Sequence, residues 1–313
     1  MIYESCLELI FGDVFLKIEE SALARKSCEL YMKLEGFSIG GSIKIKPALN
    51  MIKQLELRGR LRPGGKIIES SSGNLGVALS IICAVKGYKF ICVVDPNVLE
   101  ASERLMKIYG ADVIKVREKD KNGGYLGTRI SVIKDMLKED SSICWTNQYE
   151  NMDNVNAHYL TTAQEIYKSF PKADYIFVGA GTTGTLSGIS QFTRKYMPNT
   201  KVITVDTLGS VTFGGKKGKR RIPRLGTSIP PEISKYAIFD DLIMVEESET
   251  IKACSDMAGK GILFGGSTGS VISAIRKYSD YIPDNSQIIA ISPDFGERYL
   301  DIIYSLHSAL STV

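Results

Sequence analysis

The sequence is poor in the residues that hold metal ions and in those that form disulfide frameworks. It contains only two histidines, His158 and His307, and none of its six cysteines lies in a C-x-x-C pair. Two separated histidines are too few for a metal site, so we expect none. Several cysteines lie in apolar runs such as residues 90–94, which predicts reduced core residues in a cytoplasmic protein.

A membrane-spanning stretch, a signal peptide and a strong excess of one charge are also missing. No run is long and apolar enough to cross a membrane, and residues 1–17 lack the basic flank and apolar core of a signal peptide. The net charge of +4 by itself indicates no nucleic-acid partner. We therefore expect neither a membrane nor a nucleic acid as partner.

What the sequence does have is an alternation of strand-like and helical segments. Its 313 residues, 44% of them hydrophobic and 24% charged, are typical of a globular protein with room for two lobes. Apolar runs bounded by turn residues alternate with amphipathic stretches at residues 75–86, 100–109 and 156–170. This pattern predicts an α/β fold with a mostly parallel sheet in each half. The predicted strands are residues 65–69, 90–94, 112–116, 175–178, 201–205 and 287–291.

Lys44 stands where a flexible Gly-Gly-Ser turn meets the start of a predicted helix. A lysine in such a place can be desolvated and become nucleophilic, although a plain loop with a helix cap has the same pattern. Three clusters of glycine and hydroxyl residues accompany it, each after a strand-like run, at residues 70–74, 181–185 and 265–270. Ligands of open parallel sheets bind beyond the carboxyl ends of the strands, so these clusters are placed for ligand binding.

The second cluster consists of Gly181, Thr182, Thr183, Gly184 and Thr185, between an apolar strand and the start of a helix. Backbone N–H groups, threonine hydroxyls and the helix dipole there favour one anion. No lysine follows the last glycine as in a P-loop, and the glycine spacing of dinucleotide-binding proteins is missing. A single phosphate monoester fits the loop best, and a tight turn that binds nothing is the alternative.

Four segments together carry a family resemblance. Lys44, the Ser71-Ser72-Gly73-Asn74 loop, residues 181–185 and Gly266-Ser267 resemble, in order and spacing, the binding segments of the cysteine synthase and cystathionine β-synthase family. These are pyridoxal phosphate enzymes of fold type II, like the tryptophan synthase β subunit. The resemblance covers nearly the whole chain and implies a homodimer. It also implies a large cofactor-binding lobe of residues 1–38 and 153–313, and a small mobile substrate-binding lobe of residues 39–152.

The resemblance assigns a role to each cofactor-binding motif. Lys44 is expected to form the Schiff base with pyridoxal 5'-phosphate, Asn74 to bond its ring oxygen, and Ser267 to meet its pyridine nitrogen. Residues 181–185 are expected to hold the phosphate. A serine hydroxyl cannot keep the ring nitrogen firmly protonated, so the chemistry implied is β-elimination to an α-aminoacrylate, which a second nucleophile then attacks.

A closer resemblance rests on residues 69–76, 92–96, 123–130, 146–149, 206–211 and 264–270. It is to enzymes of siderophore biosynthesis that join O-phospho-L-serine to L-glutamate and release phosphate on the way to 2,3-diaminopropionate. The substrate carboxylate is then expected at Ser71, Ser72 and Gln148. The arginine and tyrosine that serve phosphoserine correspond to Arg129 and Tyr149, and the guanidinium fork suits a phosphate leaving group.

Some positions depart from the family pattern. Residues 10–16 replace the Gly-Asn-Thr-Pro-Leu run of cysteine synthases, and Ile45 and Lys46 replace an Asp-Arg pair. We place both changes near the substrate entrance or the lobe interface. These two changes bear on the acceptor nucleophile more than on the cofactor. Leu75 replaces a common threonine, which removes one polar partner of the carboxylate loop, and Gly181 stands where the siderophore enzymes have serine, which bears on the details of substrate binding.

The leading hypothesis is a β-replacement enzyme that joins phosphoserine to glutamate. The alternatives are a cysteine synthase that uses sulfide with phosphoserine or O-acetylserine, a related lyase that uses water or another amine, and a catalytically silent partner in a synthase complex. The basic run at residues 216–221 is a nucleic-acid patch, a lid that draws in anionic substrates, or a solvated loop. The lack of interleaved aromatic residues favours the last two.

Overall fold

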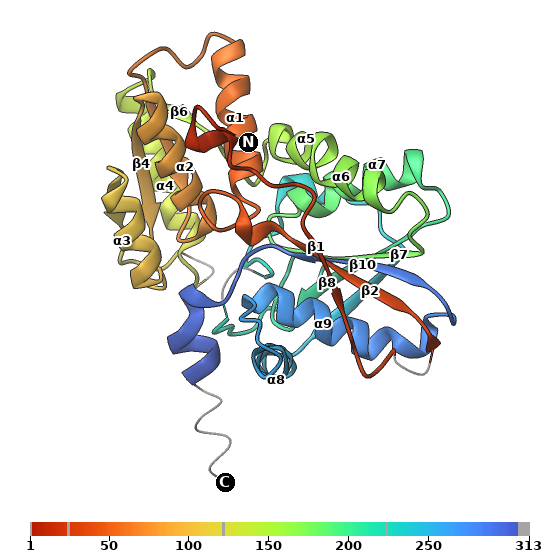
Figure 1. Cartoon of the computed structure of the whole chain (residues 1–313). Coiled ribbons are helices and arrows are strands. Elements are labelled where there is room, and N and C mark those ends of the chain that lie inside the picture. Colours follow the sequence, from red (N-terminus) through yellow and green to blue (C-terminus); the bar gives the residue numbers. More distant parts are fainter. Residues whose placement is uncertain (1, 24–25, 121–122, 223–224, 306–313) are drawn as a thin grey trace.

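The computed structural model describes residues 2–23, 26–120, 123–222 and 225–305, which form two α/β lobes (Figure 1). The sheet of the large lobe has the strand order β1-β2-β10-β7-β8-β9, and that of the small lobe β5-β4-β3-β6. Every neighbouring pair is parallel except β1 with β2. The predicted α/β fold with mostly parallel sheets is therefore confirmed. The strands of the large sheet are β1 (Phe15–Ile18), β2 (Glu29–Leu34), β7 (Tyr175–Gly179), β8 (Lys201–Thr207), β9 (Asp241–Val245) and β10 (Gln287–Ser292).

The small sheet is built from one continuous stretch of the chain. Its strands are β3 (Lys66–Ser70), β4 (Lys89–Val94), β5 (Asp112–Lys115) and β6 (Cys144–Trp145). All six predicted strands occur, with ends shifted by two residues at most. The sequence patterns missed β1, β2 and β9, and the two-residue β6 lies at Trp145, in a run that also resembles a strand. The strands divide along the chain as the predicted lobes do, and the bounds of the lobes themselves stay a prediction.

Helices cover both faces of each sheet. The small lobe contains α1 (Ile45–Leu57), α2 (Asn74–Lys86), α3 (Glu100–Ile108) and α4 (Leu126–Glu139). In the large lobe, α5 (Met152–Leu160), α6 (Thr162–Ser169) and α7 (Gly184–Tyr196) lie on one face of the sheet. The opposite face carries α8 (Glu247–Ala258) and α9 (Gly266–Tyr278), as Figure 1 shows.

One predicted helix is broken in two. The sequence predicted a single helix over residues 156–170, but α5 ends and α6 begins at Thr161, whose φ and ψ are −122° and −79°. The Thr161 hydroxyl donates to the carbonyl oxygen of Ala157 at 2.7 Å. The Thr161 N–H donates to the same oxygen at 3.1 Å, and such additional bonding by a threonine hydroxyl bends helices.

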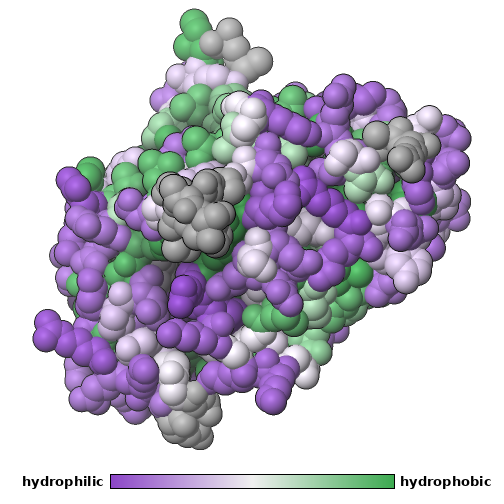
Figure 2. All heavy atoms as spheres, turned by 90° about the horizontal axis from the view of Figure 1, so that it is seen from below, coloured by the Kyte–Doolittle hydropathy of each residue, from purple (hydrophilic) through white to green (hydrophobic). Residues whose placement is uncertain are grey.

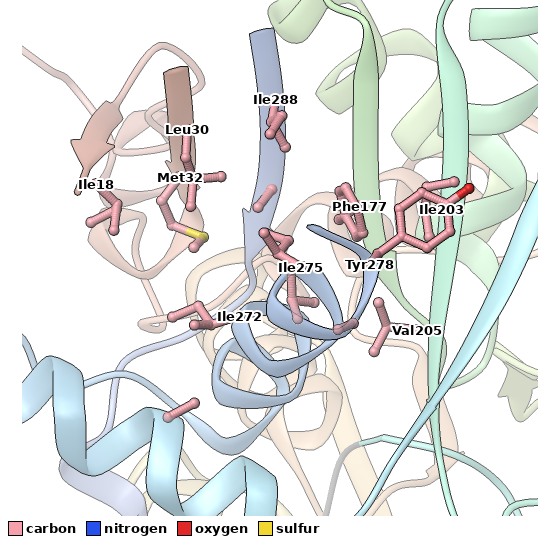
Figure 3. Packing of buried hydrophobic residues seen from close by; sticks show 14 of the residues in the cluster. Ile18, Leu30, Met32, Phe177, Ile203, Val205, Ile272, Ile275, Tyr278 and Ile288 are labelled. Carbon is pink, nitrogen blue, oxygen red and sulfur yellow. The ribbon is translucent and has the colours of Figure 1, made fainter. Parts of the chain in front are cut away.

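The core of the large lobe lies between the sheet and α9. Figure 3 shows Ile272, Ile275 and Tyr278 of α9 turned toward side chains of the overlying strands, and all three belong to one buried cluster. Along β10, Ile288 joins this cluster, whereas its neighbour Ile289 packs with the helices of the opposite face. A parallel strand covered on both faces has no polar face, which explains the nearly continuous apolar run of β10.

The parallel arrangement brings the carboxyl ends of the strands together. The first glycine cluster follows β3 and leads into α2, and the second follows β7 and leads into α7. The third does not follow a strand, so that part of the prediction was wrong. Instead, Phe264 forms a single bridge with Phe295, and the Gly265 N–H donates to the carbonyl oxygen of Asp294 at 3.3 Å. The loop before α9 therefore packs against the turn that follows β10.

The surface and the cysteines agree with the composition. On the face shown in Figure 2, hydrophilic residues predominate and hydrophobic residues form smaller patches between them. Within the described ranges, no helix has the length and hydrophobicity that a membrane span requires. All six cysteines are free; Cys83, Cys92, Cys144 and Cys254 are buried as predicted, whereas Cys6 is exposed and Cys28 is half-buried.

Candidate active site

A cavity of about 630 Å³ is lined by residues of both lobes, at the carboxyl ends of the strands. Every site residue predicted from the sequence lines it, although their chemical roles stay predictions. From the small-lobe side these are Lys44, Ser71, Ser72, Asn74, Arg129, Gln148 and Tyr149, and from the large lobe Gly181, Thr182, Thr183, Gly184, Thr185 and Ser267.

Lys44 is the residue that caps the N-terminus of α1. Gly40 and Gly41 precede it with φ values of +81° and +67°, a conformation that favours glycine and turns the chain sharply. The Ile43 N–H then donates to the carbonyl oxygen of Pro293 at 2.8 Å, and Ser42 forms a bridge with Asp294. The turn after β10 thus fixes the backbone from which the Lys44 side chain enters the cavity.

The loop at the start of α7 has the properties of an anion site. Thr183 caps the helix with φ +68°, which is strained for a β-branched residue, and its buried hydroxyl has no hydrogen-bond partner. The first N–H groups of any helix also lack intrahelical partners, and their dipoles favour an anion. A side chain at Gly184 would collide with Asn154, so the loop requires glycine there.

His158 supports this loop from behind. It is fully buried, and its Nδ1 and Nε2 lie 3.0 Å and 3.2 Å from the hydroxyl oxygens of Thr162 and Thr185. Burial lowers the pKa of His158 well below 6.5, and the positive charge of Lys44 lowers it further. A neutral imidazole has one donor and one acceptor nitrogen, so it can bond both hydroxyls while remaining uncharged.

We expect the protein to lose stability below pH 6.5 through His158. Because its folded-state pKa lies below the unfolded value of 6.5, the unfolded chain binds one more proton as the pH falls. The free energy of unfolding should drop by roughly 1 kcal/mol between about pH 7 and pH 5.5 through this group. Urea unfolding of wild type and His158→Gln at several pH values measures it as a difference in slope. Parallel stability curves for the two proteins would contradict the assignment.

Asn74 is held by residues from the end of the chain. Its Nδ2 donates to Asp294 Oδ2 at 2.7 Å, and its Oδ1 accepts from Arg298 Nη1 at 2.7 Å. Arg298 Nη2 also donates to the carbonyl oxygen of Gly40 at 2.8 Å, and the Tyr299 hydroxyl donates to Asp294. Asp294 and Arg298 therefore orient the Asn74 amide and tie it to the turn before Lys44.

Glu69 supports the part of the cavity wall that contains Gln148. This fully buried carboxylate accepts hydrogen bonds from the Ser70 and Gln148 N–H groups, at 2.7 Å and 3.1 Å, and from the Thr146 hydroxyl at 2.5 Å. Burial raises its pKa, while these donors oppose that rise. Gln148 Nε2 donates to the carbonyl oxygen of Ser70 at 3.1 Å, so its amide is fixed at the cavity wall.

Ser71 prepares the N-terminus of α2 for an anion. Its hydroxyl oxygen accepts from the N–H groups of Gly73 and Gly76 at 3.3 Å and 3.0 Å. The side chain thereby satisfies two donors of the first turn, and the helix dipole still favours a negative charge in the adjoining cavity. A substrate carboxylate suits this position.

Arg129 is buried in the cavity wall, not exposed to solvent as an arginine at the start of a helix usually is. Its Nη1 donates to the Ser72 hydroxyl at 3.0 Å, and its Nε lies 3.4 Å from Asp95 Oδ2. Ser72 in turn donates to Asp95 at 3.1 Å. Burial raises the pKa of the Tyr149 phenol, and the positive charge of Arg129 opposes this rise. Arg129 therefore forms a small charged cluster beside Tyr149.

Two of the family departures, Ile45 and Lys46, have structural explanations that do not involve the substrate. Ile45 and Lys46 do not line the cavity: Ile45 is part of the small-lobe core. Lys46 Nζ lies 2.9 Å from Glu35 and 2.6 Å from Glu165, and Lys33 completes a buried ion-pair cluster where α1 meets the large lobe. Ile45 therefore packs within the small lobe and Lys46 joins α1 to the large lobe, so our expectation that they bear on the acceptor loses its support.

Sequence reasoning missed several residues of the cavity. Asp95 and Asp294 line it, although the sequence assigned a role to neither, and Asp95 lies within residues 92–96 of the closer resemblance. The basic run, left open between a lid and a solvated loop, also contributes Lys219, Arg220 and Arg221 to the lining. Only their spatial neighbours show that these residues belong to the site.

The residues present fit the cofactor that the sequence resemblance implies. The strained loop with its unpartnered Thr183 hydroxyl at the N-terminus of α7 suits a phosphate. The Lys44 amine and the Asn74 amide line the same cavity, and Ser267 enters it from the first turn of α9. This donor set matches a pyridine ring that carries one aldehyde, one hydroxyl and one phosphate.

Comparisons with known proteins agree with this fit. The family described as pyridoxal-phosphate dependent enzyme matches residues 16–294. A Ralstonia nicotianae protein named N-(2-amino-2-carboxyethyl)-L-glutamate synthase is 37% identical over 306 residues, which cover 97% of this chain and 90% of that protein. A protein of the same name from Cupriavidus metallidurans is 36% identical over 309 residues, with the same coverage. The solved O-acetylserine dependent cystathionine β-synthase from Helicobacter pylori has a TM-score of 0.89 and 26% identity, covering 97% of this chain and 99% of its own.

Proposed function

The chain belongs to the family of pyridoxal-phosphate dependent enzymes, and we propose that it joins O-phospho-L-serine to L-glutamate. The products are N-(2-amino-2-carboxyethyl)-L-glutamate and phosphate. The proposal rests on Arg129, which is buried in the cavity wall beside Ser72 and Tyr149, where a phosphate leaving group needs a cation. The names of the Ralstonia and Cupriavidus relatives support the same reaction.

Pyridoxal phosphate, when bound, supplies the electron sink that allows a substituent to leave the β-carbon of an amino acid. In our proposal Lys44 holds it covalently, Asn74 and Ser267 contact its ring, and residues 181–185 hold its phosphate. The protein backbone already holds the Thr183 loop in its strained conformation, so the phosphate site needs little reorganisation when the cofactor binds. The Lys44 amine is also the base that we assign to the α-proton of the substrate.

The donor substrate is held at both ends. Ser71, Ser72 and Gln148 take its carboxylate, which the N-terminus of α2 favours. Arg129 bonds the phosphate and neutralises the charge that develops as it leaves. Ser72 connects the carboxylate site with the phosphate site, because its hydroxyl also accepts a hydrogen bond from Arg129. We propose that the small lobe moves toward the large lobe once both ends are engaged, which excludes water.

A cysteine synthase remains the second candidate. The similarity to an O-acetylserine dependent cystathionine β-synthase favours a thiol or sulfide acceptor with the same donor chemistry. Both candidates are cytoplasmic enzymes of amino-acid biosynthesis, the first in a siderophore pathway, and we propose a homodimer in either case.

The two candidates differ in their acceptor, so a product assay separates them. The purified holoenzyme is incubated with phosphoserine and with glutamate, aspartate, sulfide or no acceptor. We expect phosphate release to depend on glutamate and the mass spectrum to contain the glutamate adduct. Phosphate release and cysteine formation with sulfide alone would establish the second candidate in its place.

A further inference from the structure

A basic segment of the large lobe forms part of the cavity wall. Lys219, Arg220 and Arg221 line the cavity, whereas Lys216 of the same run is exposed and does not. These cations belong to the large lobe, whereas Arg129 of α4 belongs to the small lobe. An enzyme that joins two anionic amino acids needs a cationic binding site for each of them.

The segment is fixed to the body of the large lobe. The Gly218 N–H donates to the carbonyl oxygen of Gly209 at 3.1 Å. The N–H groups of Arg221 and Ile222 both donate to Glu247 Oε1, at 2.5 Å and 2.7 Å. These two bonds attach the segment to Glu247 in the first turn of α8. The backbone presents its basic side chains at a defined place.

Arg220 turns inward and supports the segment. Its Nη1 donates to the carbonyl oxygen of Leu225 at 2.8 Å, and its side chain fills the space beside Gly226, where a Cβ would collide with it. Burial lowers the pKa of Arg220, and the nearby carboxylates of Asp206 and Glu247 oppose that shift. It thereby braces the segment, whereas Lys219 and Arg221 are exposed at the cavity.

The charges that line the cavity are unbalanced toward the positive side. Its described acidic residues are Asp95 and Asp294, which already serve Arg129 and Asn74. In the part of the chain that the structure describes, no carboxylate lies within ion-pair distance of Lys219 or Arg221. An anionic ligand is the partner that such side chains lack.

We propose that Lys219 and Arg221 bind the carboxylates of a dicarboxylic amino-acid acceptor and so select it over sulfide. This inference rests on the proposed function and names the acceptor site. In this proposal the acceptor turns its amine toward the donor's β-carbon, and Lys219 and Arg221 take its carboxylates at the cavity wall. Sulfide offers no carboxylate, so a basic wall gives it no comparable selection. The phosphate of the donor is served from the opposite lobe by Arg129.

The test compares Lys219→Gln, Arg221→Gln and their double variant with Lys216→Gln, a matched loss of charge in the same run. In the holoenzyme, we expect KM for glutamate to rise roughly 10-fold in each single variant and about 100-fold in the double variant, as charged hydrogen bonds predict. The kcat and KM for phosphoserine should stay unchanged, and Lys216→Gln should resemble wild type. Added salt should raise KM for glutamate in wild type but not in the double variant.

The outcomes separate this inference from the proposed function. If wild type forms no adduct with glutamate, the proposed function fails and the acceptor site fails with it. If wild type uses glutamate but the double variant keeps its KM, the acceptor site alone is overturned. A rise in KM for phosphoserine of the same size would assign the segment to the donor and also overturn the inference.

Discussion

Replacing Lys44 with alanine is expected to abolish the reaction and the visible absorbance of the bound cofactor. Lys44 lies at the N-cap of α1 and lines the same cavity as the anion loop of α7. Its amine serves in our proposal both as the covalent anchor and as the base for the α-proton, so its loss removes two functions at once. We expect kcat/KM to fall roughly 10⁴-fold or more, about 5.5 kcal/mol of activation free energy.

Lys53→Ala is the matched control, because Lys53 is an exposed lysine of the same helix that does not line the cavity. It should keep both absorbance and rate. Reduction of the wild-type holoenzyme with borohydride, followed by peptide mass spectrometry, locates the attachment directly. Cofactor fixed to any other lysine, or visible absorbance that survives in Lys44→Ala, would remove Lys44 from its proposed role.

The sequence predicts those parts of the site that depend on local sequence patterns. Lys44 follows a glycine turn, and the first two hydroxyl clusters each join a strand to a helix, so chain geometry alone carries them to one edge of a sheet. The burial of Arg129 cannot be predicted from such local patterns. Its surroundings are Asp95 and Ser72, which come from other segments of the small lobe, and no periodicity indicates that they meet.

The residues that sequence reasoning missed act over long separations. Asp294 contacts Asn74 across 220 positions of the chain, and Arg298 joins Asn74 to Gly40. These contacts arise because β10 lies between β2 and β7 in the large sheet, which brings the end of the chain beside its beginning. The pairing of β2 with β10 was itself unforeseen, since the charged residues Glu29 and Lys33 interrupt the apolar residues of β2.

Of the two places expected for Lys46, the substrate entrance and the lobe interface, the structure shows the second. Lys46 stands only two residues after Lys44, which lines the cavity. In the helix, however, side chains two positions apart point in different directions. Lys46 therefore faces Glu35 and Glu165 of the large lobe while Lys44 faces the cavity. The helical geometry thus explains why Lys44 lines the cavity whereas Lys46 forms ion pairs with the large lobe.

Replacing Arg129 with methionine is expected to remove the preference for a phosphate leaving group. The guanidinium is the cation of the small-lobe wall that is buried beside Ser72 and Asp95. Without it, phosphate loses charge-assisted hydrogen bonds, and Asp95 is left as an unpaired negative charge near the site. We expect kcat/KM for phosphoserine to fall about 10²–10³-fold, whereas that for O-acetylserine, whose leaving group is smaller and less charged, should change far less. Lys134→Met, an exposed position on the same helix, should leave both rates unchanged.

A second substitution separates the two causes of that loss. Asp95→Asn in the Arg129→Met background removes the unpaired buried charge but restores no partner for the phosphate. We therefore expect the double variant to recover stability against urea, because a lone buried carboxylate is costly, while its rate with phosphoserine stays low. Full recovery of the phosphoserine rate would mean that Arg129 acts only by neutralising Asp95, and the phosphate site would have to be sought elsewhere in the cavity. An equal loss of rate with both donors would instead make Arg129 a support of the cavity wall that does not distinguish leaving groups.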